Sequence, residues 1–322
     1  MRLCYFAAIS GFSWGCVQTG ITPDADPVVE SVKVTETFLQ VSNPKVDVLW
    51  VVDNTGSMAA EQAALAVSFE RFVEAMDEAA LAYQLGVVTT EVDAVGAGEL
   101  LGNPWIITPE SEDASVAFAD AVSVGTDGAG AEAGLAAMML ALDEPLRSTS
   151  NRGFRRDDAA LHVIVVSDDD DDSDASVVHP TPEPVSAAVD FLDAEAEATG
   201  LPAFFSAVVC DEVGGCTCQG GAIYGERYMD VADATGGVVS SICEGDLGAV
   251  VAALGELSIT YPDTFPLQSV PTDGDVVVDV DGARVSEGWT LTDAPAVVFD
   301  APPAPGAIIE VSYELTWVES SS

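Results

Sequence analysis

The fold is decided by the stretch Val46-Asp47-Val48-Leu49-Trp50-Val51-Val52-Asp53-Asn54-Thr55-Gly56-Ser57. Its first part is almost entirely apolar, which is typical of a central strand covered on both faces. Its second part is polar and contains glycine, which predicts a tight loop. From Ser57 onward we expect a helix, with an apolar face formed by Leu65, Phe69, Phe72 and Met76 and a polar face formed by Glu61, Glu70, Glu74 and Glu78.

The same succession of buried strand and helix continues up to residue 257. Strands that alternate with helices imply right-handed crossovers and a mostly parallel, doubly wound α/β sheet with helices on both faces. In such sheets, ligands bind at the carboxyl ends of the strands. Further strands are expected at 83–89, 105–108, 161–166, 203–209 and 238–242, and helices at 114–122, 131–142, 185–198, 224–234 and 247–257.

The pattern changes after residue 258. The runs 276–280, 296–299 and 308–317 are strand-like, lack helical periodicity and are separated by Gly and Pro. They predict a small, all-β, sandwich-like domain over residues 259–322. An alternating run at 31–40 predicts one more strand, which either opens the α/β domain (31–258) or pairs with the β tail.

Charge and composition limit the classes of partner. Acidic residues outnumber basic ones 54 to 10, so the formal net charge of the 322 residues is −44. Such a surface repels nucleic-acid phosphates and anionic lipid headgroups, and neither is an expected partner. Its simplest explanation is solubility in a salty environment, where charges are screened. The hydrophobic share of 48% argues against global disorder.

The first residues indicate export. An apolar stretch, too short to span a bilayer, follows Arg2 and ends at Gly15-Cys16. We expect a signal peptide of lipoprotein type over 1–16, lipidation at Cys16 and a tether over 17–30; a plain cleaved signal and a misassigned start are the alternatives. The chain would then lie in the cell envelope or on the outer surface and touch the membrane only through this anchor. A G-x-S-x-G match at 11–15 lies inside this segment and carries no function.

Four further cysteines, Cys210, Cys216, Cys218 and Cys243, predict disulfide bonds in an exported protein. Cys216 and Cys218 are too close in sequence to bridge comfortably. Two pairings remain, each joining one of them to Cys210 and the other to Cys243. A zinc site is disfavoured because the usual C-x-x-C spacing is absent.

The polar loop carries the candidate chemistry. Asp53 offers a carboxylate, and Thr55 and Ser57 offer hydroxyls at alternate positions directly after a buried strand. Mg²⁺ prefers hard oxygen ligands and keeps several of its waters, so this donor set suits it and leaves a coordination position open. The alternative is an ordinary helix-capping turn, since Asp, Thr and Ser all cap helices well.

The loop resembles the D-x-[ST]-x-S motif of von Willebrand factor A and integrin I domains, their metal-ion-dependent adhesion site. In that family a Thr before a later helix and an Asp after the central strand complete the site, and Thr126 and Asp168 stand in these places. The resemblance covers about residues 45–257. The stretch from Arg227-Tyr228-Met229 to Ile242-Cys243 and the β tail also look like those of bacterial surface lipoproteins. The resemblance to von Willebrand factor A domains implies a divalent cation, Mg²⁺ above all with Mn²⁺ or Ca²⁺ as alternatives, whose open position takes an Asp or Glu carboxylate of a protein partner.

The expected function is therefore metal-dependent binding or adhesion at the cell envelope, and the alternative is a structural scaffold whose metal site is not essential. An enzyme is disfavoured: of the two histidines, His162 lies in a buried strand and His179 has no recognisable partner, and no phosphate-binding loop is present. The run Asp169–Asp172 is interpreted as a solvated acidic loop, with an accessory calcium site as the less favoured alternative.

Overall fold

The computed structural model describes residues 29–40, 45–128, 132–217, 222–244, 247–272, 274–304 and 306–318. Its centre is a five-stranded sheet in which every pair of neighbouring strands is parallel. In spatial order the strands are β3 (Ala82–Thr89), β2 (Lys45–Val52), β4 (Ala160–Val166), β5 (Ala203–Val209) and β6 (Val239–Ser241). The α/β prediction is confirmed, and the stretch that begins the sequence argument forms an inner strand.

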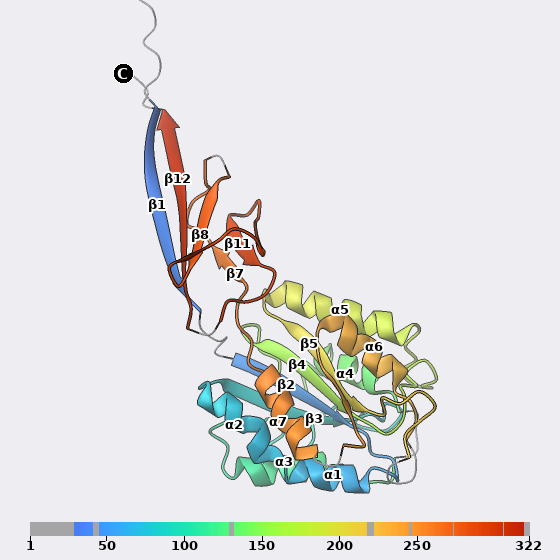
Figure 1. Cartoon of the computed structure of the whole chain (residues 1–322). Coiled ribbons are helices and arrows are strands. Elements are labelled where there is room, and N and C mark those ends of the chain that lie inside the picture. The colour runs from blue at the N-terminus through green and yellow to red at the C-terminus, as the bar shows by residue number, and fades with distance from the viewer. Residues whose placement is uncertain are drawn as a thin grey trace, which may run out of the picture.

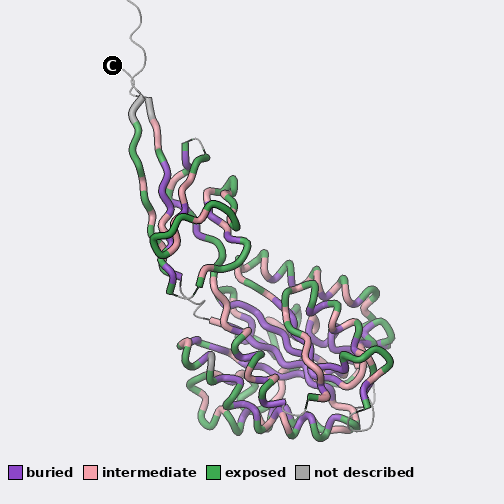
Figure 2. The backbone as a smooth tube through the Cα atoms, in the orientation of Figure 1, coloured by how far each residue is buried: buried purple, intermediate pink, exposed green. Residues whose placement is uncertain are grey.

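Helices cover both faces of this sheet (Figure 1). One apolar core lies under α1 (Ala59–Ala66), α2 (Phe69–Glu78), α3 (Ala114–Val122) and α7 (Leu247–Leu257), and a second under α4 (Gly134–Leu142), α5 (Pro184–Thr199) and α6 (Glu226–Thr235). The fully buried Trp50 anchors the first core through edge-on contacts with Phe72 and Phe118. In Figure 2 the buried residues follow the strands of the sheet.

Two local predictions are wrong. The single helix expected after Ser57 is divided into α1 and α2 at Ser68, whose hydroxyl donates to the carbonyl oxygen of Ala64 at 2.6 Å while its backbone N–H bonds to Leu65. The strand expected at 105–108 is reduced to an isolated bridge between Ile107 and Leu85.

A separate β region is built from both ends of the described chain. A four-stranded antiparallel sheet has the order β1 (Val29–Leu39), β12 (Ile308–Val318), β8 (Val276–Val280) and β9 (Ala283–Val285), and a three-stranded sheet has the order β10 (Trp289–Leu291), β11 (Ala296–Phe299) and β7 (Thr264–Pro266). Apolar side chains from both sheets, among them Phe265, Val297 and Ile309, share one core.

Strand β1 pairs with β12 over its whole length, from Val29 opposite Val318 to Leu39 opposite Ile308. Residues 29–39 therefore belong to the β region, and β2 is the first strand of the α/β domain. The β region lies beyond the amino-terminal end of β2, so the carboxyl ends of the parallel strands face away from it (Figure 1).

A buried ion network fastens the amino-terminal end of β2. The Asp47 carboxylate is fully buried and accepts hydrogen bonds from the backbone N–H of Arg156 at 2.7 Å and from the guanidinium Nε of Arg156 at 2.7 Å. The Asp47 carboxylate also forms an ion pair with the guanidinium of Arg155. The Nε atom of Arg155 in turn donates to Glu195 on α5 at 2.7 Å. The network thus joins β2, the segment before β4 and α5.

We predict that Asp47→Ala destabilises the α/β domain by about 3–5 kcal/mol, because Arg155 would be left buried with an incomplete set of partners. Asp157→Ala is the matched control in the same domain. It breaks an ion pair with Arg147 in which the Asp157 side chain is 95% exposed, so we expect only a small loss. Urea unfolding followed by helical circular dichroism measures both effects, since all helices of the described residues lie in the α/β domain. Equal losses in the two variants would contradict the prediction.

Candidate metal-binding site

The register of two strands brings the first site residues together. Val52 at the end of β2 lies opposite Val166 at the end of β4, so Asp53 and the pair Ser167-Asp168 leave the sheet side by side. The backbone N–H of Asp53 donates to the carbonyl oxygen of Val166 at 3.0 Å. The fully buried Asp53 carboxylate also accepts a 2.7 Å hydrogen bond from the Ser167 hydroxyl, which fixes its orientation.

The loop that follows β2 turns its hydroxyls outward. The backbone N–H of Thr55 donates to Asp53 Oδ1 at 2.7 Å, so the carboxylate closes the turn. The hydroxyl oxygens of Thr55 and Ser57 lie 3.4 Å apart, with Thr55 half-buried and Ser57 exposed. Burial raises the pKa of Asp168, an interaction with the Ser57 hydroxyl lowers it, and the charge of Asp53 raises it again. The structure thus places Asp53, Thr55, Ser57 and Asp168 at one rim of the sheet.

The loop of Thr126 lies against the same turn. The side-chain amide of Gln62 donates to the carbonyl oxygens of Asp53 at 2.9 Å and Gly125 at 2.8 Å, and so ties the two loops together. The backbone N–H of Gly128 donates to the Asn54 carbonyl oxygen at 2.9 Å. Within the described residues, the Thr126 hydroxyl forms no hydrogen bond with the other four candidate ligands. The structure therefore brings the Thr126 loop next to the Asp53 loop, but no hydrogen bond connects the Thr126 side chain to the other candidate ligands.

One atom of the cluster points to a cation. Asp168 Oδ1 is buried and has no hydrogen-bond partner, whereas buried polar atoms in native proteins are almost always paired. The donors around it are carboxylates and hydroxyls, the hard oxygen ligands of Mg²⁺. Over the described ranges no group of three or more His, Cys, Asp or Glu side chains is arranged to hold a metal. A cation here would depend on the hydroxyls as well as the carboxylates, and the residues fit such an ion.

The acidic run after β4 is only partly solvated, which corrects its interpretation as a loop in water. Asp171 is 1% exposed and accepts the backbone N–H of Leu135 at 3.0 Å, while the Ser173 hydroxyl accepts that of Ala136 at 3.0 Å. The Tyr228 hydroxyl accepts the N–H of Gly134 at 3.1 Å. These groups cap the first turn of α4 from outside the helix.

Gly134 and Arg227 keep this arrangement compact. A Cβ atom on Gly134 would lie 2.6 Å from the Tyr228 hydroxyl oxygen, so the close approach requires glycine. The backbone N–H of Arg227 donates to Asp170 at 3.0 Å, and its guanidinium donates to the Asp171 carbonyl oxygen at 2.8 Å. Two of the carboxylates in the run are therefore structural, and the accessory calcium site stays untested.

The remaining carboxylates crowd the rim with negative charge. Burial, followed by the charges of Asp53, Asp169 and Asp172, raises the pKa of Glu132 to about 7. Burial and the neighbouring aspartates raise the pKa of Asp169 to about 6. Glu132 was missed by sequence reasoning, although it lies two residues before the first residue of α4, the helix after the Thr126 loop. Such a field attracts a cation and lowers the site's tolerance for a bare anion.

The other residues singled out in the sequence have separate positions. Cys210 and Cys216 form a disulfide, which is one of the bonds expected, and Cys243 is also disulfide-bonded. Cys218, Cys16 and the rest of residues 1–28 lie outside the described residues. His162 is fully buried between the hydroxyls of Ser206 and Ser258, each 2.8 Å from a ring nitrogen. Burial lowers its pKa to about 3, so it is a neutral core residue.

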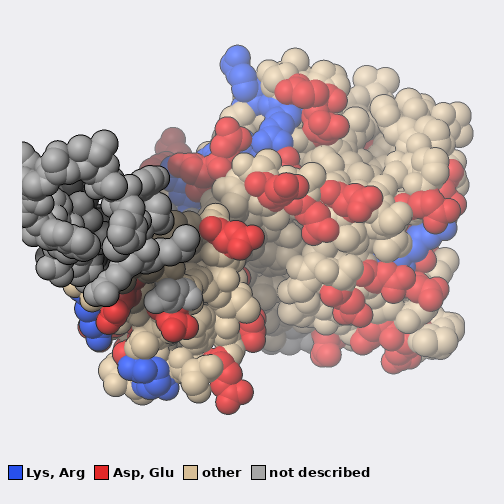
Figure 3. Space-filling view, turned by 90° about the horizontal axis from the view of Figure 1, so that it is seen from above, with Lys and Arg blue, Asp and Glu red and all other residues tan. Residues whose placement is uncertain are grey.

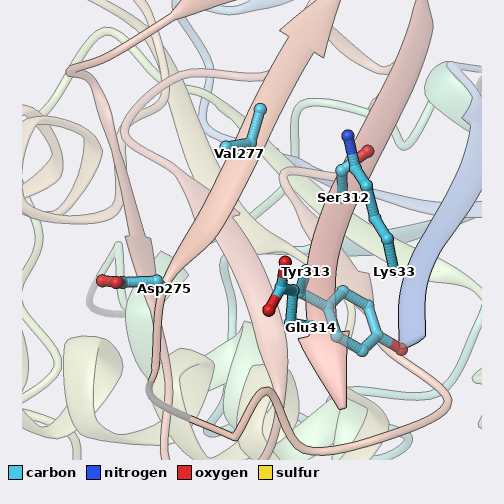
Figure 4. A pocket seen from close by; sticks show the side chains of 6 residues that line it. All are labelled: Lys33, Asp275, Val277, Ser312, Tyr313 and Glu314. Carbon is cyan, nitrogen blue, oxygen red and sulfur yellow. The ribbon is translucent and has the colours of Figure 1, made fainter. Parts of the chain in front are cut away.

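Two hollows of the surface are lined by residues other than the candidate ligands. A pocket of about 350 Å³ opens on the β region, lined by Lys33, Asp275, Val277, Ser312, Tyr313 and Glu314 from β1, β8, β12 and the residue before β8 (Figure 4). Another of about 300 Å³ lies beside α4 and His179. The face in Figure 3 carries many scattered carboxylates and few basic side chains. Because Ser57 is exposed at an open rim, the site is more accessible to a macromolecule than a closed pocket would be.

No model of a known protein family matches the chain, and no curated protein matches it. Among solved structures it is similar to the open pilus adhesin SpaC from Lactobacillus rhamnosus GG, at 12% identity and a TM-score of 0.42, over 92% of this chain and 42% of that one. It is also similar to proximal thread matrix protein 1 from the mussel byssus (12%, 0.40, 70% and 49%) and to the conserved hypothetical protein BatB from Bacteroides thetaiotaomicron (15%, 0.36, 66% and 98%). The chain thus spans less than half of SpaC. At these identities and TM-scores, its function has to be inferred from its own residues.

Proposed function

We propose that this chain is a metal-dependent binding protein of the von Willebrand factor A type. Asp53, Thr55, Ser57, Thr126 and Asp168 would hold a divalent cation, Mg²⁺ above all, with Mn²⁺ and Ca²⁺ as alternatives. When bound, the cation supplies an open coordination position for an Asp or Glu carboxylate of a protein partner. The single observation that carries the proposal is the buried, unpartnered Oδ1 atom of Asp168 beside the outward-facing hydroxyls of the Asp53 loop.

Each residue has a definite task in this mechanism. Hydrogen bonds from Ser167 and from the Thr55 backbone hold the Asp53 carboxylate in one orientation, so little conformational entropy is lost when a cation binds. Ser57 is exposed and faces the side from which a partner approaches. The partner's carboxylate meets a strongly acidic chain, so its affinity depends on local neutralisation of the rim.

The proposed place of action is the cell envelope or the outer surface, with an N-terminal lipid anchor as the only contact with a membrane. Among the helices that the structure describes, none has the length and apolar character needed to span a bilayer. The proposed partner is a protein, in agreement with the open rim and with the repulsion that the formal charge of −44 exerts on nucleic acids.

Cation binding is tested by thermal unfolding with and without Mg²⁺ after treatment with EDTA. At about 100-fold excess over the dissociation constant, Mg²⁺ should stabilise the wild-type chain by about 2.7 kcal/mol. Asp53→Asn keeps the shape of the side chain and removes its charge, so this gain should be lost. Glu70→Gln, at an exposed position of α2, is the matched control and should respond as the wild type does. An unchanged melting temperature of the wild type in Mg²⁺, Mn²⁺ and Ca²⁺ would refute the metal site.

Carboxylate recognition is tested on an array of peptides that contain Asp or Glu, printed beside the same peptides with Asn or Gln. We expect binding to the acidic peptides in Mg²⁺, because only they can fill the open coordination position. EDTA and Asp53→Asn should each abolish it. Binding that survives EDTA, or that does not distinguish the carboxylate from the amide, would contradict the mechanism and favour the scaffold function.

A further inference from the structure

Glu61 on α1 is buried although the sequence places it on the polar face of a helix. Glu61 is only 6% exposed, whereas Glu70, Glu74 and Glu78 on the next helix are exposed. Its Oε2 atom is buried and has no hydrogen-bond partner. A carboxylate oxygen in this condition is unfavourable unless a proton or a cation compensates its charge.

Glu61 lies near the proposed cation ligands. The next residue of α1, Gln62, donates to the carbonyl oxygens of Asp53 and Gly125, so the start of this helix lies against both loops of the site. Burial raises the pKa of Glu61, and the negative charge of Asp168 raises it further. Asp168 carries the other unpartnered carboxylate oxygen of the rim.

In the part of the chain that the structure describes, no basic side chain forms an ion pair with Glu61 or Asp168. The described carboxylates are also not arranged so that three of them could bind one ion directly. Mg²⁺ keeps several of its waters when it binds to proteins, and such a water can link an outer carboxylate to the ion.

We propose that Glu61 is a positioning carboxylate of the cation site, which accepts a hydrogen bond from a cation-bound water and thereby favours strongly hydrated ions. The inference rests on the proposed function and deepens it, because it names the residue that sets cation affinity and preference. It also explains why Asp168 and Glu61 each have an unpaired carboxylate oxygen. Both oxygens would interact with the same cation, Asp168 as a direct ligand and Glu61 through a cation-bound water.

Isothermal titration with Mg²⁺ and with Ca²⁺ tests this on the full chain, in the wild type, in Glu61→Gln and in the control Glu70→Gln. Glu61→Gln should weaken Mg²⁺ binding by about 10-fold, as loss of an outer hydrogen-bond partner does. It should weaken Ca²⁺ binding less, because Ca²⁺ sheds its waters more readily. Glu70→Gln should leave both affinities unchanged.

Thermal unfolding in EDTA separates this task from a purely structural one. If Glu61 is an uncompensated charge, Glu61→Gln should raise the melting temperature in EDTA while it reduces the gain from Mg²⁺. A carboxylate with a purely structural task would instead give a lower melting temperature in EDTA, and that result would overturn the inference. Equal Mg²⁺ affinity in Glu61→Gln and the wild type would overturn the inference alone. A wild type that binds no cation would overturn the proposed function together with it.

Discussion

Because β2 pairs with β4 in register up to Val52 and Val166, both strands end at the same level and Asp53 lies beside Ser167. The site follows from this register. A shift by one residue would move the side chains of β2 to the other face of the sheet and break the hydrogen bond between Ser167 and Asp53. The apolar side chains that fix the register, Trp50 above all, are packed in the core and have no part in the chemistry.

The polar groups around the site are of two kinds: some have their hydrogen bonds satisfied within the protein, and others keep an atom without a partner. Asp171 and Ser173 satisfy the amide groups at the start of α4, and Asp170 is held by Arg227, so these groups are fully used inside the protein. Asp168 and Glu61 each keep an oxygen without a partner. The distinction between used and unused carboxylates, more than their number, separates a candidate ligand from a structural residue in so acidic a chain.

The strands were predictable from the sequence because a strand buried on both faces needs a continuous apolar run, and the residues of β2, β4 and β5 form such runs. The candidate ligands Asp53, Thr55, Ser57 and Asp168 were likewise predictable, because they follow the ends of these apolar runs. The tasks of Asp171 and Glu61 were not, because each depends on groups that only the tertiary structure brings close. Glu61 has the spacing of a solvated helix face, and Leu135, whose backbone N–H donates to Asp171, lies 36 residues away in the chain. The break at Ser68 depends on one side-chain hydrogen bond that competes with the helix.

The chain passes from β1 through five residues into β2, and Asp53 directly follows that strand. A pulling force applied at the start of β1 and resisted at the Asp53 loop would therefore travel along one covalent line of two strands. Strands already rise about 3.3 Å per residue, near the limit of an extended backbone, so peeling β1 from β12 would lengthen this line very little. Because β1 is the edge strand of its sheet and pairs with β12, tension would reach the loop without first separating the other strands of that sheet.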